Sequence, residues 1–377
     1  MDDTSRLSRL LAYLEHDPDN LALLSDAANA ALDESALDHA DALVKRYAGL
    51  AGLPPSLTNT AGIVAMRRGD REGARVAFEA LRGAGFDNPP VRFNLAWLAA
   101  LDGRNDEVLE LLDDEVIATV PRASALKVQA LHHLGEVDEA VAQGRVLLEH
   151  LPDDDALLGA VAVAAMDADD YALSAQLAGR ARGGVDALTT QGLVALNENA
   201  PDAALALFER ALAEDPVAPR AWLGRGLGLL AQGDSAAAAA ALEKGAGIWG
   251  DHLGSWIAAG WARFVDGDLA GARRNFETAL AHDDNFAESH GALAVLDLAA
   301  GDLASAQRRA EIALRLDKES FGGMLARAML FEAKGQPDLA KRVIERAMIL
   351  PAGVGGQTLA QVLTGLGTAP AARTPRR

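Results

Sequence analysis

The chain has 377 residues, of which 50% are hydrophobic and 24% are charged, as in a globular protein that folds in water. Its 54 acidic residues outnumber its 35 basic ones, which favours basic partners over nucleic acid, because phosphate binding needs a basic surface. The chain has no cysteine, which excludes disulfides, thiolate catalysis and cysteine metal sites.

The sequence shows no membrane or export signal. No apolar run reaches the roughly 18 residues that a membrane-spanning helix needs. The first residues, Met1-Asp2-Asp3, are acidic, and no basic region, apolar core and cleavage site follow them in series. We therefore predict a cytoplasmic protein without a transmembrane helix or a secretory signal peptide.

The first predicted element is a short amphipathic helix over residues 5–15, which places four leucines on one side. Asp17-Pro18-Asp19 should end this helix, much as similar segments end helices further along the chain. We interpret residues 1–20 as an N-terminal cap for the structure that follows.

A pattern with a period of 34 residues follows this cap. It is clearest in four glycines, at Gly233, Gly267, Gly301 and Gly335. In the repeat that begins at Pro219, apolar residues spaced three and four apart form one stripe on each of two helices. Glycine at the turn should end the first helix, because glycine readily adopts the left-handed conformation. Asn199 replaces this glycine one repeat earlier, and asparagine is the next best residue for that conformation.

This pattern resembles the tetratricopeptide repeat (TPR), which has an aromatic residue, a Leu-Gly, a Tyr, and then Ala, Phe, Ala and Pro. One repeat carries these features as Trp256, Gly260, Ala272, Phe276 and Ala279. The resemblance covers residues 21–351 and implies about ten repeats. It also implies an all-α fold, a right-handed TPR superhelix (α-solenoid) of helix-turn-helix repeats with short capping helices at both ends.

We divide the predicted solenoid into two sets of repeats. Repeats one to five take residues 21–184, and repeats six to ten take residues 185–351. The bounds of the first five are 21–54, 55–88, 89–120, 121–154 and 155–184. The third repeat is two residues short. The fifth is the least regular, with a shortened linker at Arg182-Gly183-Gly184, so we expect a bend or hinge near residues 182–185.

Residues 352–377 follow the last repeat. Residues 352–356 form a glycine-rich spacer, and residues 357–366 are predicted to form a last amphipathic helix. Its apolar side is formed by Leu359, Val362, Leu363 and Leu366. This helix either covers the end of the stack, as terminal elements must, or fills the groove of the same chain. Residues 368–377 should be disordered.

The resemblance implies that the first helix of each repeat lines a concave face, with positions 5, 9 and 12 directed into it. These positions are almost continuously apolar in repeats six to ten and more polar in repeats one to four. We predict that a partner-binding groove is lined by Phe93, Trp97, Leu193, Leu196, Leu223, Leu227, Leu230, Ile257, Trp261, Phe264, Val295, Leu298, Leu325 and Met329. Any one of these side chains could instead belong to the core between neighbouring first helices. As a set they favour an interaction site, because large apolar patches typically mark one.

Other motifs do not predict chemistry. The glycines of residues 224–228 follow no strand, so a nucleotide-binding loop is not expected. His132 and His133 would point about 100° apart on a helix and chelate a metal poorly. The acidic clusters at 153–155 and 167–170 lack the glycine and terminal glutamate of a calcium loop.

The carboxylate clamp that some TPR domains use to bind chaperone tails is not expected either. Its five positions need lysine, asparagine and arginine in a set order. The best register in this chain gives Asn59, Ile63, Asn94, Arg122 and Leu126. Only two of these residues suit a clamp.

These observations predict a non-enzymatic scaffold or adaptor without cofactor or metal, which binds a peptide or helix of a partner protein in the concave groove. The partner should offer an apolar or amphipathic segment with basic charge. Analogy with TPR proteins of this plain type suggests a bacterial secretion, pilus or envelope complex. The alternative is a self-assembling structural protein that forms oligomers or filaments.

Overall fold

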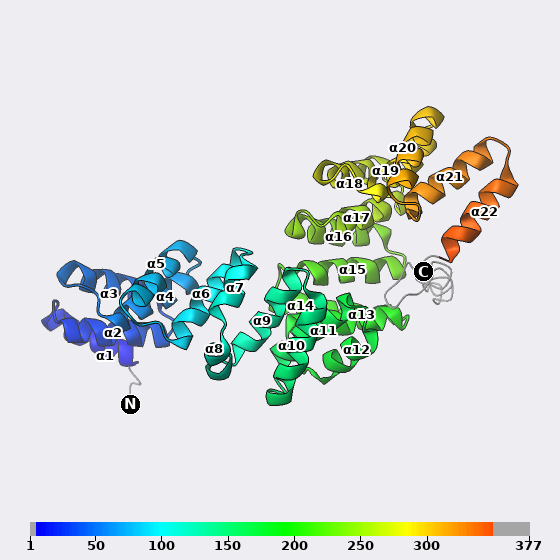
Figure 1. Cartoon of the computed structure of the whole chain (residues 1–377). Coiled ribbons are helices and arrows are strands. Elements are labelled where there is room, and N and C mark those ends of the chain that lie inside the picture. The colour runs from blue at the N-terminus through cyan, green and yellow to red at the C-terminus, as the bar shows by residue number, and fades with distance from the viewer. Residues whose placement is uncertain (1–4, 350–377) are drawn as a thin grey trace, which may run out of the picture. The chain divides into compact units, whose positions relative to one another are not determined.

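The computed structural model describes residues 5–349 (Figure 1). In this part of the chain it contains 22 α-helices and no β-strand, which confirms the predicted all-α fold. Its contacts divide the chain into two compact parts, Met1–Leu147 and Leu148–Arg377, which we call the N-terminal unit and the C-terminal unit. The two sets of repeats drawn from the sequence, with their boundary at residue 184, stay a prediction.

The N-terminal unit begins with the predicted cap helix. This helix, α1 (Arg6–His16), buries Leu7 and Leu14 in a core shared with the first repeat. The helices that follow are α2 (Leu21–Asp33), α3 (Leu37–Leu50), α4 (Pro55–Arg67), α5 (Arg71–Gly83), α6 (Pro89–Leu101), α7 (Asn105–Leu111), α8 (Asp114–Thr119) and α9 (Arg122–His133). α10 (Val137–His150) crosses the boundary between the two units.

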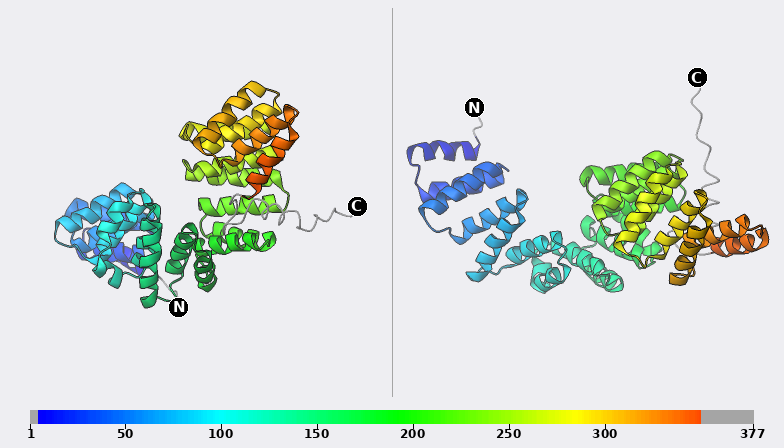
Figure 2. Two further views of the ribbon diagram at one scale, coloured as in Figure 1. Left: turned by 45° about the vertical axis from the view of Figure 1, so that its right-hand side comes forward. Right: turned by 90° about the horizontal axis from the view of Figure 1, so that it is seen from above.

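In the C-terminal unit, the first helix of each repeat packs against the second helix of that repeat, which in turn packs against the next first helix (Figures 1 and 2). The helices are α11 (Asp155–Asp167), α12 (Tyr171–Arg180), α13 (Val185–Asn197), α14 (Pro201–Glu214), α15 (Pro219–Ala231), α16 (Ser235–Trp249), α17 (Leu253–Val265), α18 (Leu269–His282), α19 (Ala287–Ala299), α20 (Leu303–Leu316), α21 (Phe321–Ala333) and α22 (Pro337–Met348). Each predicted repeat is therefore a helix pair, with one exception in the N-terminal unit.

The turns inside the repeats have the predicted left-handed backbone. Gly267 has φ +83°, and Asn199, which replaces the glycine, has φ +59°. Where an aspartate follows the turn glycine, it caps the next helix, as when the Asp268 carboxylate accepts a hydrogen bond from the Gly271 N–H at 2.8 Å. The Gly-Asp pair thus ends one helix and begins the other.

The second helices supply large side chains that fill the space between consecutive first helices. Phe208 of α14 is fully buried between Gly192 of α13 and Gly224 of α15. A Cβ atom on Gly192 would lie 2.5 Å from the Phe208 ring, and one on Gly224 would also overlap it. The small residues of the repeat pattern are therefore required because the aromatic ring occupies the volume that a side chain would need.

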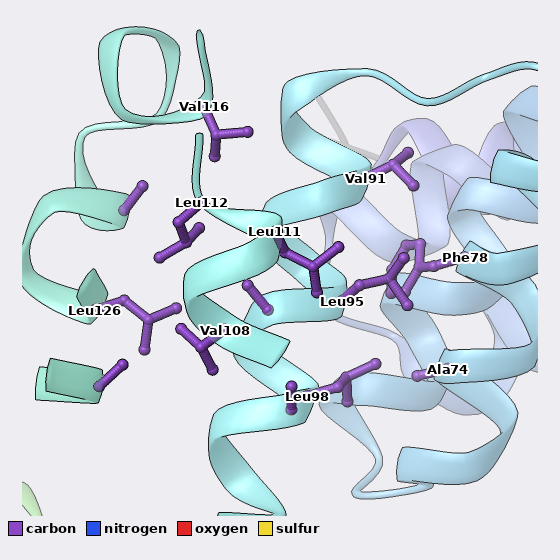
Figure 3. Packing of buried hydrophobic residues seen from close by; sticks show 14 of the residues in the cluster. Ala74, Phe78, Val91, Leu95, Leu98, Val108, Leu111, Leu112, Val116 and Leu126 are labelled. Atoms are coloured by element: carbon purple, nitrogen blue, oxygen red, sulfur yellow. The ribbon is translucent and has the colours of Figure 1, made fainter. Parts of the chain in front are cut away.

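The third repeat departs from the expected helix pair. Its second helix is broken into α7 and α8, because the Asp113 carboxylate accepts a hydrogen bond from the Val116 N–H at 3.0 Å and starts a new helix. Arg92 of α6 forms ion pairs with Asp113 and Glu115 and holds this new helix start in place. Figure 3 shows that Leu111, Leu112 and Val116 still point into the core on either side of the break.

The fifth repeat, where a bend or hinge was expected, is closely packed against the sixth. α11 contacts α13 directly, and a Cβ atom on Gly159 would lie 3.0 Å from the Ala187 nitrogen. The Arg182 N–H in the short linker donates a hydrogen bond to the Asp155 carboxylate at 3.0 Å. A hinge at this point stays a prediction.

No helix within residues 5–349 combines the length and the apolar character that crossing a membrane requires. The predicted spacer 352–356, the helix 357–366 and the tail 368–377 lie outside the described residues, as does the end of the last repeat at residue 351.

Candidate partner-binding groove

The predicted lining residues differ in how far they reach the surface. Trp97 and Leu227 are the most exposed, with 39% and 41% of their surface accessible. Ile257 and Val295 are buried, with 8% and 1% accessible, so they support the surface and cannot contact a partner. The others are half-buried, namely Phe93, Leu193, Leu196, Leu223, Leu230, Trp261, Phe264, Leu298, Leu325 and Met329.

Five of these residues come together over α17, α19 and α21, and with Phe321 we call them the aromatic cluster. The five are Trp261, Phe264, Leu298, Leu325 and Met329, and all pack against the same buried core. The Trp261 ring lies 5.6 Å from Phe264, 5.3 Å from Phe276 and 5.9 Å from Phe321, measured between ring centroids. These side chains pack against the core, and Trp261 also contacts Phe264 and Phe321, so only part of each is available to a partner.

Phe321 was missing from the predicted lining. It is the first residue of α21, whereas the prediction used only positions 5, 9 and 12 of each repeat. The sequence offered one signal for it: Phe321 is aromatic at a repeat position that is otherwise leucine, alanine or proline in repeats seven to nine. In the structure, Phe321 is 38% exposed.

A second group of predicted residues lies on α13 and α15, and we call it the leucine face. It consists of Leu193, Leu196, Leu223, Leu227 and Leu230. Leu223 and Leu230 pack against the core beneath α15 and α17, and Leu196 lies close to Gly228 of α15. Leu227 is the exposed member of this face, at 41%, as Phe321 is of the aromatic cluster, at 38%.

The N-terminal unit carries its own aromatic pair on α6. The rings of Phe93 and Trp97 are 6.3 Å apart. Phe93 packs onto the core of this unit, whereas Trp97 is exposed. This pair therefore forms a smaller apolar surface. The core beneath it is a different one from the core beneath the leucine face.

A backbone contact between α19 and α21 shapes the aromatic cluster. A Cβ atom on Gly291 would lie 2.5 Å from the Gly322 carbonyl carbon, and one on Gly322 would lie 2.7 Å from the Ala292 nitrogen. The Gly322 N–H also donates a hydrogen bond to the Glu288 carboxylate of α19 at 3.0 Å. Only glycine allows two helices to approach this closely, and the approach brings Phe321 within reach of Trp261.

Ion pairs join neighbouring repeats next to these apolar surfaces. Arg263 of α17 donates to both carboxylate oxygens of Glu243 of α16, at 2.8 and 2.5 Å, and Asn275 of α18 donates to one of them at 2.9 Å. The hydrogen bond from Arg263 lowers the pKa of Glu243 although burial opposes it. At the next junction, Arg273 of α18 donates to Asp297 of α19 at 2.8 Å.

The motifs for which the sequence predicted no chemistry lie inside helices or at helix ends. Gly224, Gly226 and Gly228 are inside α15 and buried, so they form no loop. His132 and His133 are at the end of α9 with their rings 5.6 Å apart. Asp154 and Asp170 cap α11 and α12. Within residues 5–349 no group of three or more histidine and carboxylate side chains is placed to hold a metal ion.

One histidine has a perturbed environment. The His252 ring stacks on Trp249 with ring centroids 4.2 Å apart, and its Nδ1 lies 2.5 Å from the Ser255 hydroxyl. Burial lowers the pKa of His252, and the nearby Arg220 guanidinium lowers it further. Arg220 itself donates to both oxygens of Asp167 at 3.0 and 2.7 Å. This arrangement joins α11, α15, the end of α16 and the start of α17, and its Ser255 hydroxyl is buried, with 1% of the residue surface accessible.

Comparison with known proteins supports the repeat assignment. The sequence model of a family described as tetratricopeptide repeat matches residues 189–251, which span α13 without its first four residues and all of α14, α15 and α16. No curated protein matches the chain in sequence.

Two solved structures share the fold over most of the chain. A structure of an IFIT1 monomeric mutant with m7Gppp-AAAA is 12% identical, covers 91% of this chain and 95% of its own, and has a TM-score of 0.53. A second IFIT1 structure, with Gppp-AAAA, gives the same values. A crystal structure of MamA is 18% identical and covers 41% of this chain and 91% of its own, with a TM-score of 0.35. The family match identifies residues 189–251 as tetratricopeptide repeats, and the 34-residue period and the paired helices continue the same repeat architecture through the described residues.

Proposed function

We propose that this protein is a non-enzymatic scaffold that binds an apolar or amphipathic segment of a partner protein along its first helices. The TPR fold is that of a protein-interaction scaffold. The observation that supports the proposal best is the leucine face of α13 and α15, where Leu227 is exposed among four half-buried leucines. Each large apolar side chain left in water forgoes about 1.5–3 kcal/mol, so a contiguous group of them is usually covered by a partner.

The leucine face is the better docking surface of the two in the C-terminal unit. The aromatic cluster already packs against itself, with three aromatic rings around Trp261. A partner helix would gain more by covering leucines that lack such neighbours. An amphipathic helix lying on this face would place side chains spaced three and four apart against Leu223, Leu227 and Leu230.

The charge of the protein favours a basic partner. With a net charge of −19, the chain attracts cationic segments and repels phosphates. IFIT1 was solved with m7Gppp-AAAA, but a shared fold at 12% identity does not indicate that this chain binds the same ligand. Analogy with plain TPR proteins favours a partner from a bacterial secretion, pilus or envelope complex. We propose that the two proteins bind each other in the cytoplasm.

The proposal is tested by pull-down of partners with the intact protein, with Leu227→Asp and with the matched control Leu303→Asp. Leu303 is also an exposed leucine, with 48% of its surface accessible, but it begins the second helix α20. We expect Leu227→Asp to lose specific partners that Leu303→Asp retains, with both variants as helical as the parent by circular dichroism. Identical partners for all three proteins would refute docking on the leucine face.

A further inference from the structure

The junction between the ninth and tenth repeats lacks the large side chain that fills the junctions before it. Phe208, Leu242 and Phe276 occupy equivalent positions 34 residues apart in repeats six to eight, and all three are fully buried. Ala310 of α20 holds this position in the ninth repeat. A pocket of about 440 Å³, which Ala310 helps to line, lies between α20 and α21. We call it the junction pocket.

The inner surface of the junction pocket is apolar. Ala310 and Leu330 are buried in it, and Leu314 and Phe331 are half-buried beside them. Two of these residues belong to α20 and two to α21, so both helices contribute. Such a surface suits an apolar group of a ligand, because covering it removes apolar area from water.

The rim of the junction pocket is cationic. Arg315, Arg327 and Lys334 line it and are exposed. In the described part of the chain, Arg315 and Arg327 form no ion pair, and Arg327 lies 5.6 Å from the centroid of the Phe331 ring. Lys334 donates a hydrogen bond to the Gln307 amide oxygen at 2.9 Å. These cations are therefore not neutralised by carboxylates of the described residues.

The junction pocket lies in a locally basic part of an acidic protein. Glu311 is the one carboxylate among the described residues that line it, and it accepts a hydrogen bond from the Gln307 amide at 3.0 Å. Residues 303–348 contain nine lysines and arginines and six aspartates and glutamates, whereas the whole chain has 35 and 54. An anionic ligand is therefore attracted here and repelled from most of the remaining surface.

The lining residues of α21 indicate how the charges of such a ligand are spaced. Arg327, Phe331 and Lys334 are four and three residues apart, so they lie on one side of the helix. Arg327 and Lys334 are separated by about 10.5 Å along the helix axis, at a rise of 1.5 Å per residue. Two carboxylates seven residues apart on a second helix have the same separation, with the apolar residues of that side between them.

We propose that the junction pocket binds an acidic amphipathic helix of a second partner protein. Two carboxylates of this helix, seven residues apart, pair with Arg327 and Lys334. A leucine or phenylalanine between them enters the space next to Ala310. The opposite charges of the rim and the helix favour this occupant over a basic or purely apolar one.

This site is independent of the proposed docking on the leucine face. Arg327 and Phe331 each lie two positions after a residue of the predicted groove, Leu325 and Met329. Residues two positions apart on a helix point about 200° apart. The junction pocket and the predicted groove are therefore on opposite sides of α21, and a partner in one leaves the other accessible.

The probe is a fluorescein-labelled, alanine-based helical peptide with two glutamates seven residues apart and two leucines between them. Its affinity for the full chain is measured by fluorescence anisotropy at physiological ionic strength, where distant charges are screened. We expect it to bind roughly fivefold or more tightly than the same peptide with glutamines in place of the glutamates, because two ion pairs are lost. A peptide with its glutamates five residues apart should also bind more weakly, because they then point to different sides of the helix.

Two substitutions in the junction pocket should change the affinity for the glutamate peptide in opposite directions. Arg327→Glu should weaken binding roughly tenfold, because it places a carboxylate against a carboxylate. Glu311→Gln should strengthen binding about twofold, because it removes the negative charge from the lining, and misfolding does not produce such a gain. The control is Arg210→Glu, which makes the same change in net charge at an exposed residue of α14 and should leave the affinity unchanged.

Four other results would overturn this assignment. Equal binding of the glutamate and glutamine peptides, or binding of neither, would show that the rim does not hold an acidic helix. Loss of the peptide in Leu227→Asp together with its retention in Arg327→Glu would mean that it binds the leucine face. Dimers of the parent in analytical ultracentrifugation that Arg327→Glu abolishes would mean that a second copy of the chain occupies the pocket.

Discussion

Trp261 of α17 and Phe321 of α21 meet edge to face across an intervening repeat, with ring centroids 5.9 Å apart and ring planes at 69°. The two residues belong to the eighth and tenth repeats of the sequence pattern. Their contact depends on the close approach of α19 and α21 at Gly291 and Gly322. The first helices of the last three repeats therefore form one cooperative apolar assembly, held by a backbone contact that only glycine permits.

The energy of this contact can be measured with a double-mutant cycle. We expect Trp261→Leu and Phe321→Leu to be coupled by about 0.5–1.5 kcal/mol, as for other edge-to-face aromatic pairs. Urea denaturation of the two single variants and the double variant gives the coupling energy. Trp261→Leu combined with Phe93→Leu, in the N-terminal unit, should be additive. A coupling near zero for Trp261 and Phe321 would mean that the two rings contribute independently.

The glycine contact predicts a strong penalty for one methyl group. Gly291→Ala should destabilise the protein by about 1–3 kcal/mol, because the added Cβ would overlap the α21 backbone and the helices must separate. The matched control is Gly247→Ala in α16, where an added Cβ meets no atom within 4 Å. That change should stabilise the protein by about 0.5–1 kcal/mol, as alanine does inside a helix. Equal effects of both substitutions on the urea midpoint would contradict the close approach of α19 and α21.

The period of the sequence predicted the helix pairs and their turns because each repeat marks them with local signals. Gly267 and Asn199 adopt the left-handed backbone that their residue types favour, and Asp268 caps the following helix. These features depend on residues within one turn of each other. They are therefore visible without any knowledge of the packing.

The candidate groove was less predictable because its exposure depends on distances between helices. Ile257 and Val295 follow the same sequence pattern as Leu227, yet they are buried where Leu227 is exposed. Val295 is covered because α21 lies against α19 at Gly291, a contact that the repeat period does not indicate. The break between α7 and α8 has a similar origin, since Arg92 of another helix holds Asp113 in place.

The turn conformation leads to a pair of opposite predictions. Asn199→Gly should stabilise the protein by a few tenths of a kcal/mol up to about 1 kcal/mol, because glycine relieves the strain at φ +59°. Gly267→Asn, at φ +83°, should destabilise it by a similar amount. Thermal denaturation of both variants checks the two signs. Shifts in the same direction would mean that the side chains, and not the backbone conformation, determine the stability of these turns.

The ion pair between Glu243 and Arg263 predicts how stability depends on pH. The hydrogen bond from Arg263 lowers the pKa of Glu243 in the folded protein, so the folded carboxyl group holds its proton less tightly than the unfolded one. Its contribution to stability is therefore complete above the unfolded pKa of about 4.3 and is lost as the pH falls through the lower folded value. Glu243→Gln should be less stable than the parent at pH 7, and this difference should shrink below about pH 4.

The measurement is the urea midpoint of the parent and of Glu243→Gln between pH 3 and pH 7. Glu209→Gln is the control, because Glu209 is an exposed residue of α14, and its small effect should not follow the same pH profile. High salt should reduce the difference only in part, since Arg263 and Glu243 are partly shielded from solvent by the helices they join. A stability difference that stays constant from pH 3 to pH 7 would show that Glu243 contributes through packing and hydrogen bonding alone, and not through its charge.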